Sequence, residues 1–382
     1  MRRPASRRLG SAYGVAESRS RLLRLAYLEE RVATICAAWL WTTAGFEETV
    51  ELAGLAEESA AAADALHGRA GELWPATATP DGVAHTDDLA ALADRAERAV
   101  GQHPREAALA VLLERLRGAY AEHLTATDDL QDAPTARILR ALRAGADERL
   151  QRLDAAPDLP APGTGSPPRQ SGEPARDGRF LVVSVAEYRV HDMGATPGEI
   201  VRHLLYTNAY GELEAVEILG RVLAAAPELP WPMRRALFRQ LWDEARHAEA
   251  SWQRMVELGG PPSPLPPAPP LIMTVCGQIS DPLEQLFVLQ RVVEGRVVER
   301  HRTRVVRLVR DLADPETARL YEYIVADERT HVANAAWVPR VLGDDPARLA
   351  RLAELQARCE QDLERMLALR DDVTVAPVGA AR

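Results

Sequence analysis

Apolar residues in the first half of the chain recur at steps of three and four, which is the period of an amphipathic helix. Leu22, Leu25 and Leu28 open one such series, and Val32 and Ile35 continue it. The spacing returns further along the chain without a strand signal of note. We therefore predict helices over about 18–72 with a break near Gly45, over about 105–128 and over about 134–155.

A tract rich in proline, glycine and serine interrupts this pattern at 157–179. Such a composition cannot hold a hydrophobic core, so we interpret the tract as an interdomain linker. The β-branched run that follows at 180–185 fits either one isolated strand or an extended lead-in. The predicted organisation is a flexible basic tail (1–17), a helical N-terminal domain (18–156), the linker (157–179) and a second helical domain (180–382).

Helix starts in the second domain are marked by a capping residue followed by proline. Thr196-Pro197 and Asp281-Pro282 each have a Glu at the third helical position, which is the arrangement of a capping box. Helices are therefore predicted to start near 197, 282, 315 and 346, and a further helix to run from near Pro232 to Gly259-Gly260.

The connections between these helices predict the topology. The first and second helices, and the third and fourth, are joined by short segments, so each pair should form an antiparallel hairpin. The segment 261–280 lies between the pairs. Twenty extended residues reach about 60 Å, more than the roughly 40 Å of a 28-residue helix, so this segment can cross the whole bundle. We predict an all-α chain of two four-helix bundles, the second with one long crossover.

Two helices of the second domain carry a Glu-x-x-His step with a leading aspartate. Residues three apart on a helix lie one turn apart on one face, so both side chains can bind one metal ion. Taken singly, each step is more typical of an ordinary pair on a charged helix surface than of a metal site. The steps are Asp243, Glu244 and His247 in the second helix and Asp327, Glu328 and His331 in the fourth.

A bundle that holds two metal ions needs one further carboxylate from each remaining helix. In the first helix Glu212 shares a stripe with apolar residues, whereas Glu214 and Glu217 share one with Arg221 and are expected to face solvent. In the third helix Glu294 has apolar residues at helical spacing, whereas Glu299 lies one turn from two arginines.

The depth of the candidates gives an independent check. Glu212, Glu244, Glu294 and Glu328 lie roughly 18 to 23 Å from the predicted helix starts at about 1.5 Å per residue. Antiparallel packing would bring them into one layer. The predicted metal ligands are Glu212, Glu244, His247, Glu294, Glu328 and His331.

Composition and charge narrow the function classes. The net charge of −10 disfavours a nucleic-acid partner, because phosphate binding needs a basic face. No apolar run long enough to cross a bilayer and no signal peptide are evident. Cys36, Cys276 and Cys359 show no paired spacing, which favours a reducing compartment, and we expect a cytoplasmic protein.

The second domain resembles the ferritin-like di-iron carboxylate superfamily over roughly residues 196–340. It is most similar to little-characterised bacterial ferritin-like proteins and, more distantly, to the tRNA-modifying hydroxylase MiaE, although the acidic charge disfavours a tRNA substrate. The segments that carry the resemblance are Tyr210-Gly-Glu-Leu-Glu-Ala-Val-Glu217, Asp243-Glu-Ala-Arg-His247, Val293-Glu-Gly-Arg-Val-Val-Glu-Arg300 and Asp327-Glu-Arg-Thr-His331.

The resemblance implies partners for the two histidines. It pairs Asp243 with His331 and Asp327 with His247, and an imidazole bound through one nitrogen is indeed oriented by an acceptor at the other. The alternative is that both aspartates face water.

The N-terminal domain looks like a degenerate copy of the second. Glu148 repeats Glu328, but Gln151 stands in the place of His331, and Ser59 and Ala62 stand in the places of Glu244 and His247. We expect this domain to lack a metal site. Chance matches between alanine-rich helices are the alternative.

Six oxygen and nitrogen ligands without a thiolate suit two iron ions or an iron and manganese pair. We expect an oxygen-dependent oxidase or oxygenase that acts on a C–H or N–H bond of a small organic substrate, supplied with electrons by a reductase. A homodimer is compatible with this interpretation. Alternatives are a ferroxidase or peroxide-scavenging iron protein and a metal-stabilised structural protein. Tyr210, Tyr321, Tyr323 and Trp242 are candidates for electron transfer or for lining the pocket, or are plain core aromatics.

Overall fold

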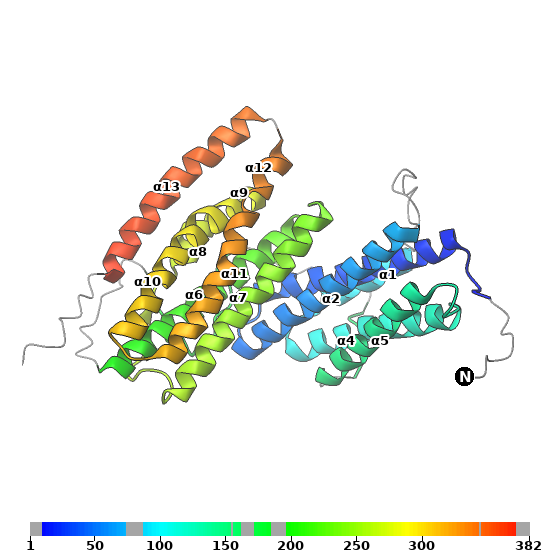
Figure 1. Cartoon of the computed structure of the whole chain (residues 1–382), viewed down its shortest axis with the longest axis horizontal. Coiled ribbons are helices and arrows are strands. Elements are labelled where there is room, and N and C mark those ends of the chain that lie inside the picture. Colours follow the sequence, from blue (N-terminus) through cyan, green and yellow to red (C-terminus); the bar gives the residue numbers. More distant parts are fainter. Residues whose placement is uncertain are drawn as a thin grey trace, which may run out of the picture. The chain divides into compact units, whose positions relative to one another are not determined.

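The described part of the chain is predominantly helical (Figure 1). The computed structural model describes residues 10–73, 87–153, 156–161, 172–184, 196–343 and 345–371. Within these residues, strand structure is limited to two segments of two residues each. The all-α prediction is confirmed. None of the described helices is long and apolar enough to cross a membrane.

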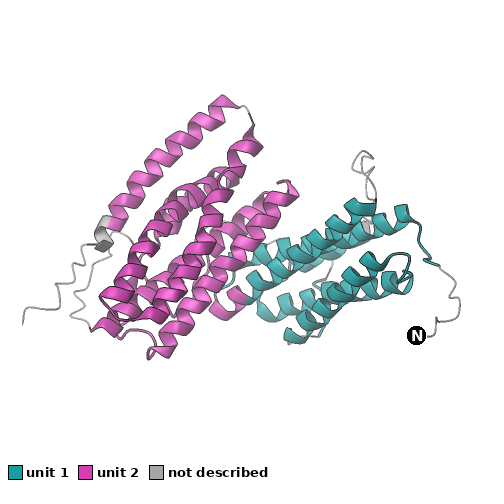
Figure 2. Cartoon of the chain, viewed as in Figure 1, with its two compact units in different colours: residues 1–43, 51–173 teal, residues 44–50, 174–382 magenta. Residues whose placement is uncertain are grey.

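The chain divides into two compact units (Figure 2). Unit 1 comprises residues 1–43 and 51–173, and unit 2 comprises residues 44–50 and 174–382. The short piece 44–50 therefore packs with the later part of the chain, which the sequence did not predict. Residues 1–9 of the predicted tail and 162–171 of the predicted linker lie outside the described residues.

The described residues of unit 1 form five helices, of which α3 was not predicted. Its short amphipathic sequence follows residues 74–86, which lie outside the described part of the chain. α1 starts three residues earlier than predicted, inside the segment assigned to the tail. The helices are α1 (Val15–Leu40), α2 (Phe46–Leu73, entering from unit 2), α3 (Asp87–Glu97), α4 (Gln102–Thr125) and α5 (Ala133–Arg152).

A buried ion pair lies in the core of unit 1. Arg149 of α5 donates two hydrogen bonds to Glu29 of α1, at 2.9 and 2.7 Å, and one to Ser59 at 2.7 Å. The Tyr120 hydroxyl donates to Glu29 at 2.6 Å. Glu148, the predicted equivalent of Glu328, is instead exposed. Charge in this core is thus balanced within the chain.

Unit 2 contains the long helices that carry the predicted ligands. The predicted starts at 197, 282, 315 and 346 are confirmed, and both hydrogen bonds of the capping box between Thr196 and Glu199 are present. α6 packs along α7, α10 packs along α11, and α7 also contacts α11. The bounds are α6 (Pro197–Ala225), α7 (Trp231–Glu257), α9 (Pro282–Val288), α10 (Glu294–Arg310) and α11 (Pro315–Asn334).

The third helix is not continuous, contrary to the prediction. A single π-helical turn, η1 (Leu289–Val293), separates α9 from α10. The Glu294 backbone N–H donates to the carbonyl of Leu289, five residues earlier. Such wide turns rotate the residues that follow them around the helix axis and are frequent at functional sites.

The connection between the two helix pairs is partly structured. The strand β1 (Leu181–Val182) pairs in parallel with β2 (Pro267–Ala268), which gives the run at 180–185 the role that its sequence left open. The short helix α8 (Leu271–Cys276) follows, so the connection is not extended throughout. α12 (Trp337–Leu342) then leads to α13 (Pro346–Asp371), which packs against α8, α9 and η1.

Aromatic residues close one side of the unit 2 core. The Phe180 ring lies 5.3 to 5.7 Å from the rings of Tyr206, Tyr210 and Trp252. Phe46, from the segment 44–50, packs on the same group. This cluster anchors the start of α2 and the β1 segment against α6 and α7.

Candidate metal centre

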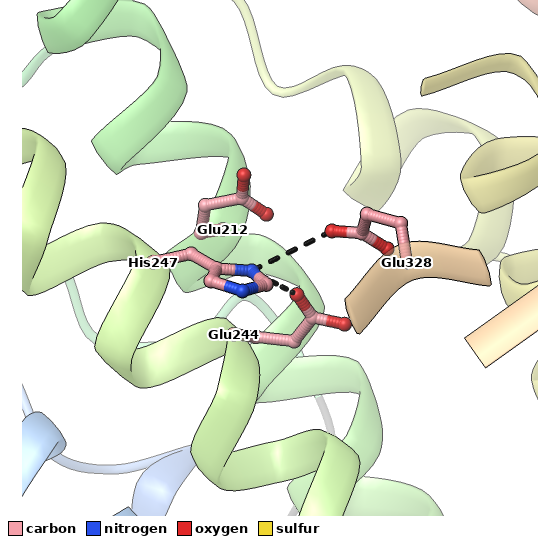
Figure 3. Close-up of side chains that lie close together, drawn as sticks. All are labelled: Glu212, Glu244, His247 and Glu328. Carbon is pink, nitrogen blue, oxygen red and sulfur yellow. Dashed lines mark hydrogen bonds and ion pairs between the residues drawn. The ribbon is translucent and has the colours of Figure 1, made fainter. Parts of the chain in front are cut away.

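The six predicted ligands converge inside unit 2. Two groups form, and within each group ligand atoms lie within 4.8 Å of one another. All six side chains are buried, none more than 6% exposed. Glu212, Glu244, His247 and Glu328 form one group (Figure 3), and Glu244, Glu294, Glu328 and His331 form the other.

Glu244 and Glu328 belong to both groups, so they lie between the two positions that a cation could take. Glu212 and His247 serve one position only, and Glu294 and His331 the other. Each position therefore has the two shared carboxylates, one further carboxylate and one imidazole. This is the donor set expected for two oxygen-preferring metal ions side by side.

The two histidines are arranged symmetrically. Nδ1 of His247 lies 3.3 Å from Glu244 and 3.5 Å from Glu328. Nδ1 of His331 lies 3.0 Å from each of the same two carboxylates. Both rings thus direct Nδ1 into the cluster, and this is the nitrogen available to a metal ion.

The outward nitrogen of each ring faces an aspartate. Nε2 of His247 lies 3.2 Å from Asp327, and Nε2 of His331 lies 3.4 Å from Asp243. These are the two pairs that the resemblance implied. The Arg246 guanidinium donates to both aspartates, at 2.7 and 2.6 Å, and so links the two pairs. An acceptor at Nε2 fixes the tautomer that leaves Nδ1 free to bind a metal.

Two buried amide side chains also hold the carboxylates, and neither was predicted from the sequence. Asn208 donates to Glu212 at 2.9 Å. Gln240 donates to Glu244 at 3.2 Å and to Glu294 at 3.4 Å. Each amide lies one helical turn before a ligand on its own helix. That four-residue spacing was visible in the sequence and could have identified them.

The cluster holds protons when no cation is present. The pKa of Glu212 and of Glu294 is raised well above the usual range, by burial first and then by the charges of Glu328 and Glu244. Burial also opposes ionisation of Glu244, but His331 and His247 bring its pKa down to about 2. The pKa of His247 and of His331 is raised, because the surrounding carboxylates outweigh burial. A metal ion would replace these protons.

The predicted orientation of Glu214 and Glu217 is wrong. Both are buried, at 1% and 6% exposure, and both pair with Arg176 from the segment before α6. Glu214 also accepts the backbone N–H groups of Ile272 and Met273 at the start of α8. The crossover and the segment before α6 cover this face of the helix, and helical spacing alone could not reveal that cover. Glu299, by contrast, is exposed as expected.

The four candidate aromatic residues differ in burial and in their contacts. Tyr210 is buried and its hydroxyl has no hydrogen-bond partner among the described residues. Tyr321 is buried and its hydroxyl lies 3.4 Å from the Leu204 carbonyl. Trp242 packs at the edge of the core. Tyr323 is 72% exposed and does not line the cavity, so it is neither a core aromatic nor a pocket residue.

The fold and the cluster define a helical protein with a buried site of four carboxylates and two imidazoles. A family model described as a protein of unknown function (DUF455) matches residues 130–345, more than half of the chain, and the chain belongs to this family. The matched region includes all six cluster residues. Searches of curated proteins and of solved structures gave no match.

Proposed function

We propose that unit 2 is a ferritin-like metal-binding bundle that holds two iron ions, or one iron and one manganese ion, and oxidises or hydroxylates a small organic substrate with O₂. The observation that carries the proposal is the convergence of six buried ligands into two groups that share Glu244 and Glu328. Oxygen and nitrogen donors without a thiolate suit these metals. Glu328 Oε1 is buried, accepts no hydrogen bond among the described residues and lies 3.5 Å from Nδ1 of His247, so it is available to bind a cation.

When bound, two such ions would supply the electrons that reduce O₂. The chain itself would do three things. The aspartates and amides orient the ligands. The burial of the six ligand side chains excludes bulk water. A cavity beside Glu212 and Glu294 can hold a molecule next to the ions. A reductase would return electrons between turnovers.

The cavity also separates this proposal from its alternatives. A protein that only stores iron or scavenges peroxide needs no organic pocket, and a metal that only stabilises the bundle needs neither pocket nor access. Here the cavity reaches two of the ligands, Glu212 and Glu294. We therefore place an organic substrate ahead of an iron-handling or structural role.

The experiment is anaerobic loading with Fe(II), measurement of metal per chain, and recording of O₂ uptake with and without extracts of small metabolites. Two ions per chain and slow uptake that a metabolite fraction accelerates are expected. Rapid uptake without an organic compound would indicate iron handling, and no uptake would indicate a structural metal.

Variants test the ligands directly. Glu244→Ala removes a ligand of both positions and should abolish stoichiometric binding, and His331→Ala removes a ligand of one position and should leave at most one ion per chain. Glu322→Ala, at an exposed position on α11, should retain two ions. Two ions per chain in either ligand variant would refute the assignment of that residue as a metal ligand.

A further inference from the structure

A cavity opens beside the cluster within unit 2. Its empty volume is about 740 Å³, including the part that is open to solvent. Residues of α6, the crossover, α10 and α13 line it, and both Glu212 and Glu294 reach its wall. Because part of this space is open to solvent, a small organic molecule can enter it from outside.

One part of the wall is apolar. Leu271 and Ile272 come from α8, Val293 and Val297 from the third helix, and Leu363 and Leu367 from α13. Hydrocarbon placed against these side chains would leave water, which favours binding roughly in proportion to the buried apolar area. This part of the wall therefore selects an apolar body.

The other part of the wall carries arginines. Arg296, Arg300 and Arg304 lie one turn apart on α10 and all line the cavity. Arg296 pairs with Glu364 of α13 at 2.7 Å, so its charge is balanced. Arg304 is different, because among the described residues no carboxylate forms an ion pair with it. It donates one hydrogen bond, to Asn208 at 3.1 Å, and lies over the Tyr321 ring.

Arg304 is connected to the metal centre through Asn208. The Asn208 carbonyl oxygen accepts from Arg304, and its amide donates to the candidate ligand Glu212. Asn208 lies one turn before Glu212, which corresponds to about 6 Å along the helix. A group bound to Arg304 would thus lie near the cluster without reaching a metal itself.

His301 adds an unsatisfied acceptor to the same wall. Its Nε2 lies 3.0 Å from the Asn208 carbonyl oxygen, and its buried Nδ1 has no partner among the described residues. Burial, together with Arg304 and His247, lowers its pKa well below the usual value, so the ring is neutral and Nδ1 is an acceptor. The Nε2–H group of His301 thus donates to the same Asn208 oxygen that accepts from Arg304.

We propose that this cavity binds an organic anion with an apolar body, whose carboxylate or phosphate group pairs with the Arg304 guanidinium while its hydrocarbon part lies along the apolar wall toward Glu294. Guanidinium groups bind both kinds of anion through paired hydrogen bonds. That this ligand is the substrate rests on the proposed function, whereas its binding does not.

Calorimetric titration of the full-length protein, both metal-free and loaded with redox-inert Zn(II), tests the proposal. The probes are hexanoate, octanoate, octyl phosphate, octan-1-ol and inorganic phosphate. We expect octanoate or octyl phosphate to bind at least ten-fold more tightly than octan-1-ol or inorganic phosphate. Each additional buried methylene should tighten binding about four-fold. The better of the two anionic octyl compounds identifies the head group.

Variants locate the binding. Arg304→Gln should weaken octanoate or octyl phosphate at least ten-fold. The matched control Arg302→Gln, on the same helix but exposed and outside the cavity wall, should not change it. Val297→Phe fills the apolar part of the cavity without altering charge and should weaken binding of the same probes. This second variant tests the proposal even if Arg304→Gln does not fold.

Three results would overturn the proposal. These are equal affinity for octan-1-ol and octanoate, equal affinity for inorganic phosphate and octyl phosphate, or affinity that is unchanged in both Arg304→Gln and Val297→Phe. Metal content is measured separately in the same samples. Failure of the metal-binding proposal can therefore be distinguished from failure of the anion-binding proposal.

Discussion

Glu294→Gln separates the effect of metal binding from that of folding. Glu294 is 2% exposed, and burial together with the charges of Glu328 and Glu244 raises its pKa well above the usual range, which favours the uncharged carboxyl group when no metal is bound. Glutamine has the same shape and carries no charge, so the metal-free variant should unfold within about 1 kcal/mol of the parent protein. Glu294 belongs to one of the two ligand groups only, so the variant should bind one ion instead of two.

The size of the effect follows from linkage. Each ion present at about 100 times its dissociation constant stabilises the fold by about 2.7 kcal/mol, and two ions by about 5.4 kcal/mol. At about 2 to 4 °C per kcal/mol for a domain of 150 to 250 residues, loading should raise the Tm of unit 2 by about 11 to 22 °C in the parent and about half of that in Glu294→Gln.

The assay combines metal analysis with thermal unfolding, with and without metal. Glu299→Gln is the control, because Glu299 lies on the same helix with its side chain 67% exposed. It should keep two ions and the full shift in Tm. Two ions bound to Glu294→Gln, or an equal shift in Tm for both variants, would refute the assignment of Glu294 as a ligand of one position.

Three further predictions concern the surroundings of the site and the other unit. Asp327→Asn should weaken metal binding about 10- to 100-fold, as measured by competition with a chelator, because the amide no longer fixes His247; unchanged affinity would remove Asp327 from the site. The pKa values of Glu212, Glu294, His247 and His331 are all raised in the folded state, so the folded protein holds more protons than the unfolded chain above about pH 6.5. Metal-free stability should therefore fall, and metal affinity rise, as the pH increases above about 6.5, as followed by urea unfolding and by proton release into weak buffer; a flat pH profile would contradict this. Arg149→Met should destabilise unit 1 by about 3 to 5 kcal/mol, because Glu29 remains buried without its partner; denaturant unfolding followed by circular dichroism would show it, and a loss below about 1 kcal/mol would count against a buried charge pair.

The positions of the six cluster residues could be predicted because they depend on local rules. A Glu-x-x-His step places two donors on one face of any helix, and the capping residues with proline set the starts from which depth is counted. The depth argument held although η1 interrupts the third helix. Glu294 is the first residue after that turn, so its direction still suits the cluster.

Features that depend on distant parts of the chain could not be predicted in the same way. Glu214 and Glu217 are buried because Arg176 and the start of α8 cover them, and neither is near in sequence. The pairing of β1 with β2 joins residues more than 80 positions apart. Helical periodicity describes which side chains share a face, but the charge of a face does not show whether another segment covers it.

The buried Arg149 of unit 1 has a consequence for how the chain matures. Its guanidinium is the counter-charge of Glu29 and belongs to the polypeptide itself, so this core is complete as soon as the helices have been synthesised. In the metal-free chain the acidic cluster of unit 2 is balanced by protons, which the raised pKa values of Glu212, Glu294, His247 and His331 favour, and under the proposed function a bound cation would replace them. Chelators or metal starvation would then lower the stability of unit 2 and leave that of unit 1 unchanged.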